Sequence, residues 1–194
     1  PQATLAPLAA TGERVILVAT GRPVHEEDAV RTVLHEIEGH ARPRARSLSA
    51  ALVLFRAGTA RGGDDQEGRA LLLEQRAGLL GSRRRRQLAA RHRAVETMTA
   101  GASFGDVALM LVDPLGLEAA EAIVIAERVF RGGDGRSPGL GRERLYLEAF
   151  VRVTAHLGAR PEDEEWLAEG QVAVDAVSAL RSTAALSGQE RARR

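Results

Sequence analysis

Cysteine is absent from the 194-residue chain, and its absence restricts the chemistry that the protein can perform. Without thiols the chain has no disulfides, no thiolate zinc site and no cysteine nucleophile. A bound metal ion would therefore need histidine and carboxylate ligands.

The chain also lacks lysine and a strong net charge. All 27 basic residues are arginine, and 26 acidic residues almost balance them. We attribute the missing lysines to codon bias. The formal charge of +1 gives little electrostatic attraction to nucleic acid, although the calculated pI is about 9.1. We therefore expect no nucleic-acid partner.

Long apolar runs are missing as well. Runs such as residues 14–19, RVILVA, fall far short of the roughly 20 residues that a membrane helix needs. The opening segment has no basic region followed by an apolar stretch, as a secretory signal would have. These absences predict a soluble, cytoplasmic protein without a membrane partner. The first residue is Pro1 and not methionine, which suggests a fragment of a longer protein.

The composition that is present is typical of one globular domain, with 44% hydrophobic and 27% charged residues. A β-branched run at residues 14–19 predicts a short buried strand followed by a turn. Acidic residues followed by apolar residues at helical spacing predict a helix over residues 26–40. We expect an α+β fold that is predominantly helical with a small β-sheet. The further helices are predicted at residues 47–57, 66–80, 83–99, 103–111, 117–130, 142–157 and 162–185.

The first candidate for chemistry is the segment His35-Glu36-Ile37-Glu38-Gly39-His40, which has the pattern HExxxH. In the common HExxH zinc motif the two histidines are four residues apart and share one helix face. A spacing of five places them about 140° apart on a regular α-helix, which would not chelate a metal ion. One wide π-type turn would bring them to within roughly 50° of each other, and Gly39 would let the helix distort or end. The motif therefore predicts a local irregularity in this helix.

Taken alone, the HExxxH pattern is weak evidence, and two surface histidines on a polar helix are the more common explanation. A zinc hydrolase needs a third protein ligand and an open fourth position for water. Glu67, in the segment Gln66-Glu67-Gly68-Arg69-Ala70, is a candidate for the third ligand.

Four segments in this order resemble those of a known family. They are HEIEGH, DDQEGRALLLE, GASFGDVALMLVDPLGLEAAEAIVIAERVFRGG and RERLYLEAF. Over roughly residues 13 to 185 the chain resembles the flavohaemoglobin expression-modulating QEGLA-motif proteins of bacteria, relatives of the microtubule-associated tyrosine carboxypeptidases. The resemblance implies a zincin-like metallopeptidase catalytic domain, placed at residues 13–187. An N-terminal extension at residues 1–12 would precede it, and a polar tail at residues 188–194 would follow it.

The resemblance also implies the roles of four residues. His35, His40 and Glu67 would be the ligands of Zn2+, and Glu36 would be the general base. These residue types suit metal-assisted peptide hydrolysis, because zinc lowers the pKa of a bound water to near neutral. A carboxylate can then carry the proton of that water to the leaving amine.

A second group of residues would recognise the substrate. The family's RVYRGG motif corresponds here to RVFRGG, and an arginine can clasp a carboxylate with two parallel hydrogen bonds. Arg131, with Arg128 as second choice, would bind the substrate's C-terminal carboxylate, unless these arginines form structural ion pairs. Tyr146 would donate a hydrogen bond to the developing oxyanion, unless it is a core tyrosine. Arg142 takes the position of a lysine in the family's Lys-x-x-x-Tyr-Leu pattern.

The chain departs from the family pattern close to the expected metal ligands. Arg69 stands where QEGLA has an apolar residue, and Gly39 replaces the threonine before the second histidine. Residues 41–44, Ala-Arg-Pro-Arg, lack the family's asparagine-glycine step. The expected ligands are all retained, so the departures concern how a substrate would be positioned.

The main hypothesis is a zinc-dependent metallopeptidase, a carboxypeptidase that acts on the C-terminus of a peptide or protein. A zinc endopeptidase is an alternative. A non-catalytic zinc-binding regulatory protein is another, and it would have a closed site of four protein ligands. The sequence indicates no oligomeric state.

Overall fold

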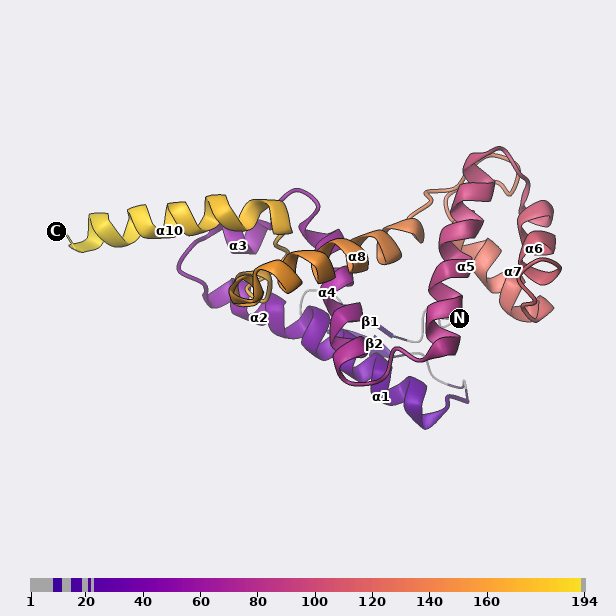
Figure 1. Cartoon of the computed structure of the whole chain (residues 1–194), viewed down its shortest axis with the longest axis horizontal. Coiled ribbons are helices and arrows are strands. Elements are labelled where there is room, and N and C mark those ends of the chain that lie inside the picture. The colour runs from indigo at the N-terminus through magenta and orange to yellow at the C-terminus, as the bar shows by residue number, and fades with distance from the viewer. Residues whose placement is uncertain (1–8, 12–14, 19–20, 22, 193–194) are drawn as a thin grey trace. The chain divides into compact units, whose positions relative to one another are not determined.

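The computed structural model describes residues 9–11, 15–18, 21 and 23–192, and their backbone is predominantly helical (Figure 1). No helix in this described part of the chain is both long and apolar enough to cross a membrane.

The chain forms two compact units. The first combines residues 1–79 with residues 149–194, and the second contains residues 80–148. All of the expected zinc ligands belong to the first unit.

The predicted sheet is a two-stranded antiparallel ribbon in the first unit. It pairs β1 (Ala9–Thr11) with β2 (Ile16–Val18). β2 confirms the strand expected within residues 14–19, of which residues 14 and 19 lie outside the described residues. The expectation that this strand is buried was wrong, because Leu17 is 53% exposed. Two strands of three residues are too small to bury their own apolar side chains.

A continuous helical stretch follows the ribbon and contains the HExxxH segment. It consists of α1 (Glu26–Leu34), the π-helix η1 (His35–Ala41) and α2 (Arg42–Ser49). Three acidic residues occupy the first turn of α1, where the helix dipole stabilises negative charge. The predicted helix over residues 26–40 is therefore confirmed, and it continues further than expected.

The prediction of one helix over residues 47–57 was wrong for residues 50–53, which are not helical. Ala50 has an extended backbone conformation and ends α2. Only the short α3 (Leu54–Ala57) follows, and it ends at Gly58, whose φ is +78°. Glycine adopts such a conformation without a steric penalty.

α4 (Gly62–Arg76) carries Glu67 and packs against two neighbouring helices. It confirms the third predicted helix, although it begins and ends earlier than residues 66–80. A Cβ atom on Gly39 would lie 2.5 Å from Cβ of Ala70, so η1 packs directly on α4. A Cβ atom on Gly68 would lie 2.4 Å from the carbonyl of Ala149, which belongs to α8 (Arg144–Ala159).

The last part of the chain completes the core of the first unit. It confirms helices at both ends of the range predicted over residues 162–185, although residues 168–173 between them are not helical. The last helix extends into the expected tail. Its elements are η2 (Pro161–Asp163), α9 (Glu164–Leu167), η3 (Val174–Ala176) and α10 (Val177–Ala192). The core cluster contains Phe55, Leu72, Val153, Leu157, Leu167, Val172, Val174, Val177 and Leu180.

The second unit is built from α5 (Ser82–Thr99), α6 (Phe104–Val112) and α7 (Ala119–Val129). All three confirm predicted helices, and Figure 1 shows them packed together. α6 begins with a capping box, in which the side chains of Ser103 and Asp106 each accept a hydrogen bond from the other residue's main-chain N–H.

Candidate metal centre

The π-helix η1 brings the two histidines of the HExxxH segment to one side of the helix. The rings of His35 and His40 lie edge to face, with centroids 5.0 Å apart. In a π-helix each N–H donates to the carbonyl five residues earlier, as the Arg42 N–H does to the Ile37 oxygen. Residues five apart are therefore neighbours, which confirms the irregularity predicted from the spacing.

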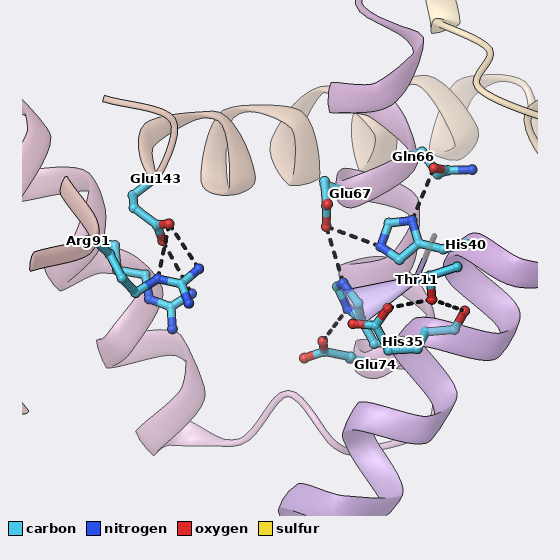
Figure 2. Close-up of polar contacts among 10 residues, drawn as sticks. Thr11, His35, His40, Gln66, Glu67, Glu74, Arg91 and Glu143 are labelled. Atoms are coloured by element: carbon cyan, nitrogen blue, oxygen red, sulfur yellow. Dashed lines mark hydrogen bonds and ion pairs between the residues drawn. The ribbon is translucent and has the colours of Figure 1, made fainter. Parts of the chain in front are cut away.

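Glu67 faces both imidazole rings from α4 (Figure 2). Its Oε2 atom lies 3.1 Å from Nε2 of His35 and 3.4 Å from Nε2 of His40. Neighbouring ligand atoms of a tetrahedral zinc ion, with bonds of about 2.0–2.1 Å, lie about 3.3 Å apart. The ligand atoms of the three residues all lie within 4.8 Å of one another. The donor set and its spacing therefore fit a zinc ion.

Two further side chains orient the imidazole rings. Nδ1 of His35 donates a hydrogen bond to Oε1 of Glu74 at 2.8 Å, and Nδ1 of His40 donates one to Oε1 of Gln66 at 3.0 Å. These bonds direct Nε2 of each ring toward Glu67. Metal-binding histidines usually have such a partner for their other ring nitrogen.

Sequence reasoning missed both of these partners, although α4 carries a signal for them. Glu74 follows Glu67 by seven residues, which is about two helical turns and therefore the same helix face. Gln66 directly precedes Glu67. A second carboxylate on the face of a metal ligand would have been a reasonable candidate for this supporting role.

The carboxylates raise the pKa of both histidines in the metal-free protein. Burial lowers the pKa of His35, but the hydrogen bonds and charges of Glu67 and Glu74 outweigh burial and raise it from 6.5 to about 9. Burial also lowers the pKa of His40, and Glu67 again outweighs it, so this pKa is raised as well. Burial raises the pKa of Glu67, but the two histidines lower it from 4.5 to about 2. The carboxylate of Glu67 therefore stays ionised. A bound divalent metal ion would take the place of the protons on the two histidines.

The side chain of Glu36, the expected general base, is held by the β-ribbon. The hydroxyl group of Thr11 in β1 donates a hydrogen bond to Oε2 of Glu36, at an oxygen–oxygen distance of 2.6 Å. The same hydroxyl is 3.4 Å from the main-chain oxygen of Glu36. The ribbon thus restricts the side chain that directly follows His35. No local sequence pattern indicates this contact, because the two residues are 25 positions apart.

The family model of the microtubule-associated tyrosine carboxypeptidases matches residues 2–188. The chain belongs to this family. No curated protein and no solved structure matches the chain. Membership of the microtubule-associated tyrosine carboxypeptidase family confirms the resemblance seen in the sequence, and it implies a carboxypeptidase-like enzyme.

In this member of the tyrosine carboxypeptidase family, each residue of the QEG segment has a distinct physical role. Gln66 orients His40, and Glu67 faces both histidines. Gly68 permits the close approach of α8, because any side chain there would meet the backbone of Ala149.

Arg128, expected to bind substrate in this family, forms a structural ion pair in the second unit. Its Nε atom lies 3.0 Å from Oε1 of Glu143, and a terminal nitrogen lies 2.9 Å from the same oxygen. Glu143 is only 4% exposed. A terminal nitrogen of Arg91 lies 3.5 Å from Oε2 of Glu143. Figure 2 shows Arg91 beside Glu143. Arg128 therefore forms a structural ion pair, which was the alternative to substrate binding considered from the sequence.

The other three residues expected to bind substrate or the oxyanion also belong to the second unit. Arg131 and Arg142 are exposed, and Tyr146 is half-buried in α8. Their roles toward a substrate remain predictions from the family resemblance.

Proposed function

We propose that the chain is a zinc-dependent carboxypeptidase that removes a residue from the C-terminus of a peptide or protein. The observation that carries the proposal is the convergence of His35, His40 and Glu67 from two helices, at distances that suit zinc. Family membership supports carboxypeptidase chemistry independently.

The residues around this site suit the hydrolysis of a peptide bond. His35, His40 and Glu67 would hold a zinc ion, which would supply Lewis acidity and make a water molecule acidic near neutral pH. Glu36 would accept a proton from the attacking water, whose oxygen would form a bond to the peptide carbonyl carbon. As the carbon–nitrogen bond breaks, Glu36 would return this proton to the leaving nitrogen. The second proton of the water would follow it, so the products would be a carboxylate and an ammonium group. Thr11 limits the rotation of the Glu36 carboxylate during both transfers.

Recognition of the substrate's C-terminal carboxylate is assigned to Arg131. Arg128 is the weaker candidate, because the buried carboxylate of Glu143 already engages its guanidinium group. Tyr146 is assigned to the oxyanion, and Arg142 to a supporting contact with the substrate. These four assignments rest on the family resemblance.

The site contains three ligand groups within residues 9–11, 15–18, 21 and 23–192. Three ligands leave a coordination position for water, as catalytic zinc sites require. This count favours an enzyme over a purely structural zinc centre.

The metal and the base are tested together with the Glu36→Gln variant. Metal analysis of the purified protein should give one zinc per chain, and Glu36→Gln should retain that zinc. Turnover should fall about 10²–10⁴-fold, because an amide does not accept the proton. Full turnover in the variant would remove Glu36 as the base, and four protein ligands in a metal-bound structure would favour the regulatory alternative.

The position of the cut is tested with peptides that have variable C-termini, each in a free and an amidated form. Mass spectrometry of the products should show the loss of one C-terminal residue from the free peptides and little cleavage of the amidated ones. Internal fragments from both forms would establish an endopeptidase instead.

A further inference from the structure

The carbonyl group of Glu38, in the middle of the π-helix η1, loses the main-chain donor that the helix geometry would provide. Arg42 donates its N–H to the carbonyl of Ile37, five residues earlier. The next donor in this register would be the N–H of residue 43, which would pair with Glu38. Residue 43 is a buried proline and has no N–H group. An unpaired carbonyl on the packed side of a helix is costly.

Arg69 supplies a donor to this carbonyl from the neighbouring helix. Its terminal nitrogen Nη1 lies 3.1 Å from the main-chain oxygen of Glu38. Arg69 is 8% exposed, and its Nε atom has no hydrogen-bond partner within the described residues. Burial of a guanidinium group is expensive, and its bond to a carbonyl that lacks a donor offsets part of this cost.

The bond links the two helices that carry the proposed metal ligands. Arg69 lies two residues after Glu67 on α4, and Glu38 lies between His35 and His40 on η1. The Arg69 bond therefore joins the helix that carries the carboxylate ligand to the turn that carries both imidazoles.

We propose that Arg69 is a positioning residue for the metal centre, which stabilises the π-turn in place of the main-chain donor that Pro43 removes. The proposal rests on the proposed function for the identity of the site. It also links two departures from the family pattern, the arginine at residue 69 and the changed segment after His40. Arg69 thus supplies the hydrogen-bond donor that Pro43 lacks, and the Glu38 carbonyl gives the buried Arg69 a partner.

The test is a double-mutant cycle with Arg69→Met, Pro43→Ala and the double variant. Alanine at residue 43 restores an N–H group, so it should remove most of the need for Arg69. Co2+ serves as the probe, because its visible absorption reports the number and geometry of its ligands. Arg69→Met should weaken Co2+ binding about 10- to 100-fold and change the absorption spectrum. The same substitution in the Pro43→Ala background should have a much smaller effect on both.

Arg76→Met is the matched control, since Arg76 is an exposed arginine on α4 that pairs with Glu164 and not with η1. It should leave the Co2+ affinity and spectrum unchanged. Equal losses from Arg69→Met in the proline and alanine backgrounds would overturn the proposal. If Arg69→Met alone fails to fold, recovery of folding in the double variant would support it, and failure of both would overturn it.

Urea unfolding of the metal-free variants separates this inference from the proposed function. Arg69→Met should lower the urea midpoint more when residue 43 is proline than when it is alanine. If the unaltered protein bound no metal ion, the proposed function would fail, whereas this coupling in urea would still support the role of Arg69 in the π-turn.

Discussion

At the scale of single residues, Glu74 determines which nitrogen of His35 is available to a metal ion. Its carboxylate is completely buried and accepts the hydrogen bond from Nδ1 of His35. A neutral imidazole has two possible tautomers, and this bond selects the one whose Nε2 lone pair faces Glu67. Glu74 thus contributes to the site without being one of its ligands.

The substitution Glu74→Gln tests this contribution. Glutamine keeps the shape of the side chain but removes the charge that orients His35 and raises its basicity. We expect zinc affinity to fall about 10- to 100-fold, measured by competition with a chromophoric chelator. Glu165→Gln, at an exposed position, is the control and should leave the affinity unchanged. An unaltered affinity in Glu74→Gln would show that Glu67 alone orients the ring.

The stability of the metal-free protein should depend on the protonation of His35. Because its pKa is raised from 6.5 to about 9 in the folded protein, its ion pairs stabilise the fold fully below pH 6.5 and are lost as the pH rises through 9. We expect the free energy of unfolding in urea, with a chelator present, to fall by on the order of 3 kcal/mol across this range. A His35→Gln variant should lack this part of the pH dependence. An identical fall in both proteins would assign the effect to other groups.

At the scale of elements, the site depends on how closely α4 approaches its two neighbours. Gly39 and Gly68 provide these approaches, since a Cβ atom on either would lie at 2.5 Å or less from an atom of the facing helix. At Gly68 the facing atom belongs to the backbone of α8, which cannot move aside as a side chain can.

We therefore expect Gly68→Ala to destabilise the protein by about 1–3 kcal/mol, through overpacking against Ala149. Gly63→Ala is the control on the same helix, because the nearest atom to its Cβ would be 3.8 Å away on the side chain of Gln171. That substitution should be neutral or slightly stabilising, because alanine favours helices more than glycine does. Chemical unfolding measures both, and similar midpoints would show that α8 yields at this contact.

Much of the element order could be predicted from the sequence, because most helices carry apolar residues at helical spacing between clear glycine or proline boundaries. The π-distortion was predictable from the five-residue spacing of the histidines, on the premise that both bind one metal ion. The break at residues 50–53 was not, since this Ala-Ala-Leu-Val segment contains no helix breaker. The chain turns there because Leu52 and Phe55 pack into the core of the first unit, and such tertiary packing overrides local propensity.

The candidate site was predictable only in part, for a related reason. The proposed ligands His35, His40 and Glu67 lie in short motifs that a single sequence displays. The contact of Thr11 with Glu36 joins a three-residue strand to a distant helix, and neither partner has a distinctive local pattern.

At the scale of the whole molecule, the two units hold different parts of the expected chemistry. The first contains the proposed metal ligands and Glu36, and the second contains Arg131, Arg142 and Tyr146. Substitutions in the second unit should therefore affect substrate recognition without affecting metal content.

Arg131→Ala tests this separation. Loss of a charge-assisted hydrogen-bond pair should lower kcat/KM for peptides with a free C-terminus about 10- to 100-fold, with the zinc content unchanged. Amidated peptides should show little further loss, because they offer no carboxylate. Arg136→Ala, also exposed in the loop after α7, is the control. Equal losses on free and amidated peptides would remove Arg131 as the carboxylate-binding residue.

The second unit interrupts the first in sequence, and this has a consequence for synthesis on the ribosome. The three proposed zinc ligands and Glu36 are translated before residue 80, yet the α8 backbone against which Gly68 packs is translated only after the whole second unit. A nascent chain that has just exposed both histidines and Glu67 still lacks α8, the helix against which α4 packs at Gly68. Stable capture of metal should therefore be a late event in biogenesis, after residues 149–159 have emerged.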